Sequence, residues 1–240
     1  MLDIVPVPAF SDNYIWLVHD EASGETAVVD PGDADPPLAE AQRRGWTITQ
    51  VWNTHWHPDH TGGNVAVKEA TGALVSAPDG PRIAARDQVI GEGSEVRLGD
   101  HRGRVIAVPG HTLDHVALIF DEERAAFVGD TLFAMGCGKL FEGTAAQMHR
   151  SLRLLAGLAQ DVRLYPGHEY TLGNARFAAQ AEPDNTAIRK RLEEVGRMRE
   201  AGQITLPTTV AEEGATNPFV RAVDAATLGR LRADKDRFSS

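Results

Sequence analysis

Three histidines and one aspartate fall within six residues of the segment NTHWHPDHTGG, which spans positions 53–63. His55 and His57 are two residues apart, so in an extended or looped segment both side chains project to the same side and can reach one ion. Asp59 and His60 lie one step further along, where they can serve a second ion. Imidazole and carboxylate ligands suit zinc, iron or manganese. The pattern predicts a metal centre rather than a solvated turn.

Three further side chains that can bind a metal each follow an apolar segment ending in glycine. His111 follows VIAVPG, Asp130 follows AAFVG, and His168 follows VRLYPG. Glycine lets the backbone turn sharply and come close to an ion. Because this pattern recurs three times after the histidine segment, we expect these residues to supply the remaining ligands of a two-metal site.

Short strands and a few helices must position these side chains. The expected strands are rich in Val, Ile and aromatic residues and end at Gly, Pro, Asp or Asn. They span 3–9, 13–20, 26–30, 48–54, 73–77, 95–99, 104–110, 115–120, 124–130 and 162–167. Helical periodicity is found at 36–45, from 62 to about 71, and at 145–158, 174–183, 186–202 and 224–238, with a polar loop at 202–218.

Strands with interspersed helices predict sheets covered on the outside by helices, an α/β architecture. The character of the chain changes after Tyr170, where helices replace strands. We therefore expect a catalytic domain at 1–170 and a small helical domain at 171–240.

The charge balance and the cysteine content restrict the function. The net charge of −10 argues against nucleic acid as a partner. Residues 186–240 are mildly positive, with 10 Lys and Arg against 8 Asp and Glu, which would suit an anionic substrate. One cysteine, Cys137, excludes an intramolecular disulfide, and the start of the chain does not read as a signal peptide. We expect a cytoplasmic monomer that binds neither nucleic acid nor membrane.

The chain resembles the metallo-β-lactamase superfamily and, within it, glyoxalase II, the hydroxyacylglutathione hydrolases. The resemblance runs nearly end to end and is carried by SDNYIWLV, VVDPG, THWHPDHTGGN, PGHT, VGDTLF, GCGKLFEGT, YPGHEYT, NPF and RADKDRF. It implies an αββα sandwich with a small C-terminal helical domain that binds substrate. The implied activity is hydrolysis of S-(2-hydroxyacyl)glutathione, such as S-lactoylglutathione, to glutathione and a 2-hydroxy acid. This is the second step of methylglyoxal detoxification.

The resemblance also implies the ligand sets of two divalent ions, for which we expect zinc, with iron or manganese as alternatives. One ion would be held by His55, His57 and His111, and the other by Asp59, His60 and His168, with Asp130 bridging both. Two adjacent cations lower the pKa of a shared water enough to supply hydroxide near neutral pH. We expect Asp59, His55, His57 and Asp130 to be catalytic, with Asp59 orienting the hydroxide.

The substrate side rests on residues that match glutathione-binding positions of similar enzymes. These are Lys139 in the GCGK turn, Tyr170 in GHEY, and Arg232 with Lys235 near the C-terminus. Phe141 stands where related enzymes often have tyrosine, which removes one hydroxyl contact to glutathione.

Three positions beside the expected ligands are open to more than one interpretation. Asp114 replaces a glycine that similar enzymes often have in HTLDH, and we interpret it and His115 as turn residues in preference to a carboxylate that orients a metal ligand. Asp30, in VVDPG, fits either an aspartate that orients a ligand or a turn residue before Pro-Gly.

Other chemistries remain as alternatives. A related enzyme with one iron, such as a glutathione persulfide sulfur dioxygenase, would not use Asp59, His60 and His168 for a second ion. A lactonase or β-lactamase would not need the C-terminal helices. A structural zinc module would close its metal with four ligands, often cysteines, whereas histidine and aspartate leave room for water.

Overall fold

The computed structural model describes residues 1–238, which form two compact units. The first unit comprises residues 1–107 and 114–129. The second comprises residues 108–113 together with the described residues from 130 onward. No helix among the described residues is long and apolar enough to cross a membrane.

The first unit contains a six-stranded mixed sheet in the order β1-β2-β3-β4-β5-β6. The strands β1, β2 and β3 are antiparallel, and β3 to β6 run parallel to one another. The strand bounds are β1 Leu2–Ala9, β2 Asn13–Asp20, β3 Glu25–Val29, β4 Thr47–Trp52, β5 Leu74–Ala77 and β6 Gln88–Val89. Parallel neighbours need crossover connections, and helices supply them between β3 and β5.

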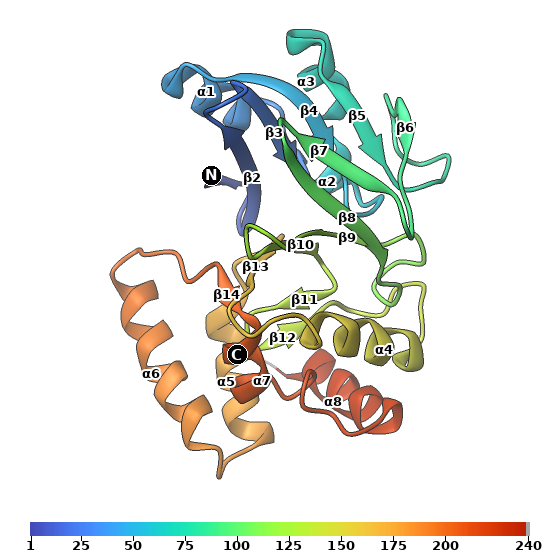
Figure 1. Cartoon of the computed structure of the whole chain (residues 1–240). Helices are drawn as coiled ribbons and strands as arrows, with labels where there is room; N and C mark the ends of the chain where they lie inside the picture. The colour runs from blue at the N-terminus through green and yellow to red at the C-terminus, as the bar shows by residue number, and fades with distance from the viewer. Residues whose placement is uncertain (239–240) are drawn as a thin grey trace. The chain divides into compact units, whose positions relative to one another are not determined.

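The crossover helices are α1 Asp35–Arg44, α2 Pro58–Thr61 and α3 Asn64–Thr71. Both α1 and α3 end at a glycine in the left-handed conformation, Gly45 and Gly72, a common way to end a helix. In Figure 1, α1 and α3 lie along the sheet formed by β1 to β6. The buried Ala41 of α1 and Val67 of α3 pack into one apolar cluster with strand residues such as Val51.

The first unit also contains four antiparallel strands that belong to a second sheet. They are β7 Glu95–Leu98, β8 His101–Ala107, β9 Val116–Phe120 and β10 Ala125–Gly129, paired in that order. Trp52 of β4 stacks on Phe120 of β9 at a ring-centroid distance of 5.6 Å, and both side chains are fully buried. The core of this unit therefore lies between two sheets, as the expected sandwich requires.

The second unit is mostly helical. It contains the hairpin β11 Leu132–Phe133 and β12 Gly136–Cys137, the strand pair β13 Arg163–Pro166 and β14 Thr208–Thr209, and five helices. The helices are α4 Ala145–Ala156, α5 Thr171–Ala181, α6 Thr186–Glu200, α7 Val210–Thr216 and α8 Ala225–Arg237. Side chains of Thr144, Asn185, Thr209 and Asp224 cap the N-termini of α4, α6, α7 and α8.

Every strand and helix expected from the sequence overlaps an observed one. The prediction of a continuous loop at 202–218 is wrong, because this segment contains β14 and α7. A signal for α7 was present in Thr209-Val-Ala-Glu212, since Thr209 accepts a hydrogen bond from the Glu212 amide at 3.2 Å. The helix has only 7 residues, too few for its periodicity to stand out.

Candidate metal centre

The histidine segment lies at the carboxyl end of two parallel strands in the first unit. Asp30 follows β3 and Thr54 follows β4, and the Asp30 amide donates to the Trp52 carbonyl at 2.9 Å. Neighbouring parallel strands end at the same edge of a sheet, where polar side chains gather in α/β proteins. This register explains why residues 24 positions apart meet at one point.

Asp30 fixes the orientation of two histidines. Its carboxylate accepts hydrogen bonds from the Thr54 amide at 2.7 Å and the Thr54 hydroxyl at 2.6 Å, and His60 Nδ1 lies 3.2 Å from Oδ2. Of the two readings left open by the sequence, the geometry matches an aspartate that orients a ligand. A carboxylate acceptor places the His60 proton on Nδ1 and leaves the lone pair on Nε2.

The same carboxylate acts on His55 through Thr54. The Thr54 hydroxyl has one proton, which it donates to Asp30, so its oxygen accepts from His55 Nδ1 at 3.0 Å. The lone pair of His55 is therefore on Nε2, which lies 3.1 Å from His57 Nδ1. Tetrahedral zinc–nitrogen bonds of about 2.1 Å place ligand atoms roughly 3.4 Å apart, so the two nitrogens fit one ion.

The second pair of the segment, Asp59 and His60, is carried by the short helix α2 rather than by a loop. His60 Nε2 lies 3.4 Å from Asp59 Oδ2, so the lone pair on Nε2 points toward a carboxylate oxygen. Asn13 donates to both Asp59 Oδ2 at 3.1 Å and the Asp59 carbonyl at 3.3 Å, which fixes this residue from β2. Asp30, His55 and His60 each offer one possible ligand atom, and these three atoms lie within 4.8 Å of one another.

His115 is more than a turn residue. It is fully buried, and its ring stacks on His55 with centroids 4.6 Å apart and planes inclined by 14°. Gly129 lies against it, since a Cβ at Gly129 would approach the His115 ring within 2.8 Å. This contact cannot be read from the sequence, because it depends on the start of β9 reaching Thr54, where the Val116 amide donates to the Thr54 carbonyl at 2.8 Å.

Asp130, His111 and His168 converge in the second unit. Oδ2 of Asp130 lies 3.5 Å from His111 Nε2 and 3.3 Å from His168 Nε2, and all three residues are buried. The Lys139 carbonyl accepts from His111 Nδ1 at 2.8 Å, which leaves the His111 lone pair on Nε2. One carboxylate oxygen within reach of two imidazoles is the arrangement that a bridging ligand needs.

Only glycine fits at position 138 of the GCGK turn. A Cβ at Gly138 would lie 2.0 Å from the Asp130 carbonyl oxygen and 2.9 Å from His111 Nδ1. The adjacent Cys137 is buried, and burial raises the pKa of its thiol to about 11. A thiol with so high a pKa stays protonated at neutral pH and is a poor nucleophile.

Aromatic rings surround the histidines of this unit. Tyr170 stacks on His168 with centroids 4.7 Å apart and planes inclined by 4°, and Phe133 contacts both rings edge-on. Phe141 packs edge-on against His111 and is 64% exposed. Phe133 was not singled out from the sequence, although it lies in the VGDTLF motif.

The C-terminal pair of cations lies on α8, as its spacing predicts, but both residues have bonds within the protein. Arg232 is buried and donates to the Cys137 carbonyl at 2.8 Å, and it pairs with Asp236 at 2.9 Å. Lys235 Nζ donates to the Gly173 carbonyl at 3.0 Å. Burial lowers the pKa of Lys235 to about 8, and the nearby Arg232 charge adds to this lowering. Their role in substrate binding stays a prediction.

Two family matches divide the chain. Residues 9–168 match the metallo-beta-lactamase superfamily, and residues 169–238 match the family described as hydroxyacylglutathione hydrolase C-terminus.

Known proteins match over nearly the whole length. A hydroxyacylglutathione hydrolase from Erythrobacter litoralis is 47% identical, covering 99% of this chain and 100% of that protein. One from Pseudomonas aeruginosa is 50% identical, covering 98% of this chain and 91% of that protein. Among solved structures, ETHE1 from Myxococcus xanthus superposes with a TM-score of 0.75 at 26% identity, over 98% of this chain and 90% of that one.

Proposed function

Because this chain belongs to the hydroxyacylglutathione hydrolases of the metallo-beta-lactamase superfamily, we propose that it hydrolyses S-(2-hydroxyacyl)glutathione to glutathione and a 2-hydroxy acid. The observation that carries the proposal is the combination of a superfamily catalytic region with a C-terminal region specific to this family, on one chain of the relatives' length. S-lactoylglutathione is the substrate to test first, as the thioester formed in methylglyoxal detoxification.

The enzyme depends on divalent metal ions, and we propose two of them. At His55, His60 and His111, the lone pair on Nε2 points toward another atom that can bind a metal. This orientation suits metal ligation. The proposed ligand sets follow the family pattern: His55, His57 and His111 for one ion, and Asp59, His60 and His168 for the other, with Asp130 shared. Zinc suits these donors best, and iron or manganese would also be accepted. When bound, the ions would supply a nucleophilic hydroxide at neutral pH and polarise the thioester carbonyl.

Asp59 is the proposed orienting group for the attacking water. Asn13 donates to Oδ2 of Asp59 and so fixes the carboxylate that would accept a proton from water. The departing group is a thiolate whose conjugate acid has a pKa of about 8.5, so it leaves without a strong general acid.

The glutathione portion carries two carboxylates and needs cations and hydrogen-bond donors. We propose that Lys139, Tyr170 and Lys235 supply them, with Arg232 holding the Cys137 carbonyl beneath the GCGK turn as well as contacting substrate. Phe141 would meet glutathione with its ring alone, which predicts weaker binding than a tyrosine would give. This assignment gives residues 171–240 the role of a substrate-binding domain and residues 1–170 that of the catalytic domain.

The test is hydrolysis of S-lactoylglutathione beside a β-lactam and a lactone, with metal content measured on the same sample. We expect fast release of glutathione, no turnover of the other two compounds, and close to two ions for each chain. One iron together with oxygen consumption would instead support a persulfide dioxygenase. The cytoplasmic location and the monomeric state stay predictions.

A further inference from the structure

The hairpin β11–β12 turns at Ala134 and Met135, and buried side chains bind the polar backbone groups of this turn. Glu213 Oε2 accepts from the Met135 amide at 2.8 Å. Asn217 Nδ2 donates to the Phe133 and Gly136 carbonyls at 3.2 and 2.9 Å, and Asn174 Nδ2 donates to the Ala134 carbonyl at 3.1 Å.

This turn is strained and needs that support. Met135 has a φ of 58°, which is in the left-handed region that favours glycine. The side chains of Glu213 and Asn217 are joined by a 2.7 Å hydrogen bond from Asn217 Nδ2 to Glu213 Oε2. We call Glu213, Asn217 and Asn174 the hairpin clamp.

The clamp acts on residues of the proposed site. Phe133, at the end of β11, contacts the rings of His168 and Tyr170 with centroid distances of 5.8 and 5.1 Å. The turn between β11 and β12 therefore sets where the Phe133 ring lies. A shift of the hairpin would loosen the stack of Tyr170 on His168.

The contacts of the Thr208 hydroxyl beside the clamp favour an extra proton on a neighbouring carboxyl group. Thr208 Oγ1 lies 2.7 Å from Glu213 Oε1 and 2.9 Å from Glu212 Oε2. Each of these two oxygen–oxygen contacts needs a hydrogen between its atoms, but a hydroxyl has only one. If both carboxylates were ionised, one contact would place two acceptors face to face. A proton on one of the two glutamates gives each contact its own hydrogen.

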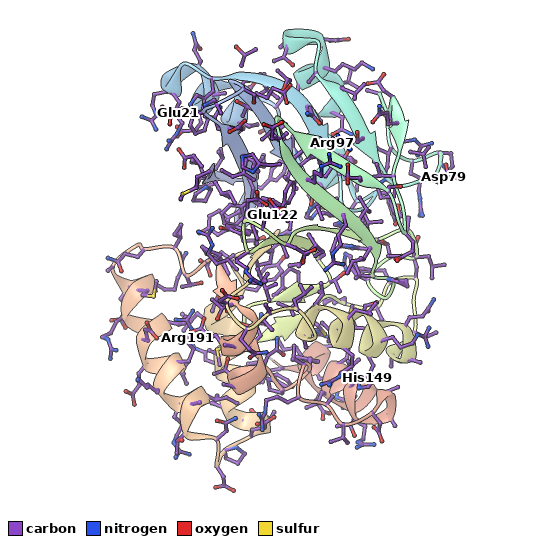
Figure 2. The ribbon with its side chains drawn as sticks, in the orientation of Figure 1. Glu21, Asp79, Arg97, Glu122, His149 and Arg191 are labelled. Atoms are coloured by element: carbon purple, nitrogen blue, oxygen red, sulfur yellow. The ribbon has the colours of Figure 1, made fainter. Side chains whose placement is uncertain are left out.

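Burial and charge identify Glu213 as the protonated residue. Glu212 has a side chain that is 31% exposed and pairs at 3.2 Å with Arg191, which projects from α6 in Figure 2. Glu213 is 1% exposed. The groups hydrogen-bonded to its carboxyl are all neutral: the Thr208 hydroxyl, the Asn217 side chain and the Met135 amide. Burial raises the pKa of Glu213 to about 7, the Glu212 charge adds to this, and the three hydrogen bonds oppose it.

We propose that Glu213 is a positioning residue that works as a neutral carboxylic acid, donating from Oε1 to Thr208, which donates to Glu212, while Oε2 accepts from the hairpin turn. In this state both contacts of the Thr208 hydroxyl have their hydrogen. Loss of the proton places a charge in an apolar interior and leaves one contact with Thr208 unsatisfied. The link to Phe133 and Tyr170 rests on the proposed function, whereas the proton itself does not.

The proton is tested by Glu213→Gln in the metal-loaded protein. A glutamine imitates the neutral acid, because its amide NH2 can donate to Thr208 and its oxygen can accept from Met135 and Asn217. Infrared spectra at pH 6 should show the carbonyl stretch of a buried carboxylic acid in the wild type, and the variant should lack it. The absence of any such difference would overturn the proposal.

Stability against pH gives a second readout. The folded-state pKa of Glu213 is raised above its ordinary value of 4.5, so its contribution to stability is complete below pH 4.5 and is lost as pH rises through about 7. Between pH 5 and 9, the unfolding equilibrium constant of the wild type should rise relative to that of Glu213→Gln by on the order of 100-fold. The two proteins differ only at position 213, so the difference between their curves reports on Glu213. Parallel curves would contradict a buried proton.

The matched variant Glu212→Gln keeps Glu213 and removes only the neighbouring charge. It should move the midpoint of the pH transition to lower pH, because Thr208 can then donate to Glu213. An unchanged midpoint would refute the hydrogen-bonded chain through Thr208.

Positioning is tested with the thioester. As pH rises above 7, the KM of the wild type should increase relative to that of Glu213→Gln, because Tyr170 is proposed to bind substrate. The kcat values of the two proteins should change in parallel with each other. If the two proteins keep the same KM ratio from pH 6 to 9 while the infrared band is present, the proton stands and the positioning role is wrong. If neither protein turns over the thioester, the proposed function fails and the infrared and stability results are unaffected.

Discussion

Asp30 Oδ2 lies 3.2 Å from His60 Nδ1, and this contact holds a buried imidazole with its Nε2 toward Asp59. Asp30 itself has a φ of 52°, an unusual backbone conformation for a residue other than glycine. Two hydrogen bonds from Thr54 fix it there. Through these bonds one carboxylate orients both His60 and His55, which we assign to different ions.

Asp30→Asn should therefore weaken both ions. The asparagine NH2 would donate toward His60 Nδ1 and force the proton onto Nε2, the nitrogen proposed to bind metal. Loss of an outer hydrogen-bond partner typically costs 10–100-fold in metal affinity, so we expect about that change in competition with a chelator. Asp35→Asn, on the exposed first turn of α1, is the control and should bind metal like the wild type. Equal affinities in the two variants would refute the orienting role.

The shared carboxylate is tested by metal counting. Asp130→Ala should lose both ions together, because Oδ2 faces His111 and His168 at 3.5 and 3.3 Å. His168→Ala should mainly empty the second site and leave close to one ion. Metal analysis of the purified variants distinguishes the two outcomes. Retention of two ions and full turnover by Asp130→Ala would show that the bridge is wrongly assigned.

Gly138→Ala tests the close approach behind the GCGK turn. The added Cβ would lie 2.0 Å from the Asp130 carbonyl, which is backbone and cannot move aside. We expect a loss of about 1–3 kcal/mol in the free energy of unfolding, the usual cost of overpacking, together with weaker metal binding. Gly196→Ala, in α6, is the control, because nothing lies within 4 Å of its Cβ. It should gain about 0.5–1 kcal/mol. Denaturant unfolding measures both.

The sequence predicted every long element and the seven candidate ligands, because their signals are local. A strand's composition and the HxHxDH spacing can be read within a short window. The relations that complete the site are not local. Asp30 reaches Thr54 only because β3 and β4 are parallel neighbours, and His115 reaches His55 only because β9 begins beside Thr54.

The buried position of Arg232 shows the same limit. Its spacing from Lys235 predicted one helical face, which α8 confirms, but the sequence does not say that the guanidinium is bonded to the Cys137 carbonyl.

The boundary between the two expected domains is another feature that the structure leaves open. The match to the metallo-beta-lactamase superfamily ends at residue 168 and the match to the C-terminal family begins at residue 169, near the expected boundary at 170, yet the compact units divide elsewhere. The division into domains at 170 stays a prediction.

The last prediction concerns Lys235, which separates substrate binding from chemistry. Its pKa is lowered to about 8, so its positive charge is present below that pH and is lost as pH rises through it. If Lys235 binds a glutathione carboxylate, the KM of the thioester should rise above pH 8 in the wild type. Lys235→Arg should remove that rise, since arginine stays charged.

Below pH 8, Lys235→Ala should keep its metals and raise KM by the equivalent of about 1.5–3 kcal/mol for a charged hydrogen bond. Arg232→Ala is the less specific variant, because it also frees the buried Cys137 carbonyl and should lower stability as well. The increase caused by Lys235→Ala should shrink at high salt, where screening already weakens the wild-type contact. Steady-state kinetics at two ionic strengths measures this, with a small neutral thioester as the control substrate. A Lys235→Ala enzyme that matches the wild type on S-lactoylglutathione at low salt would mean that Lys235 serves only its bond to Gly173.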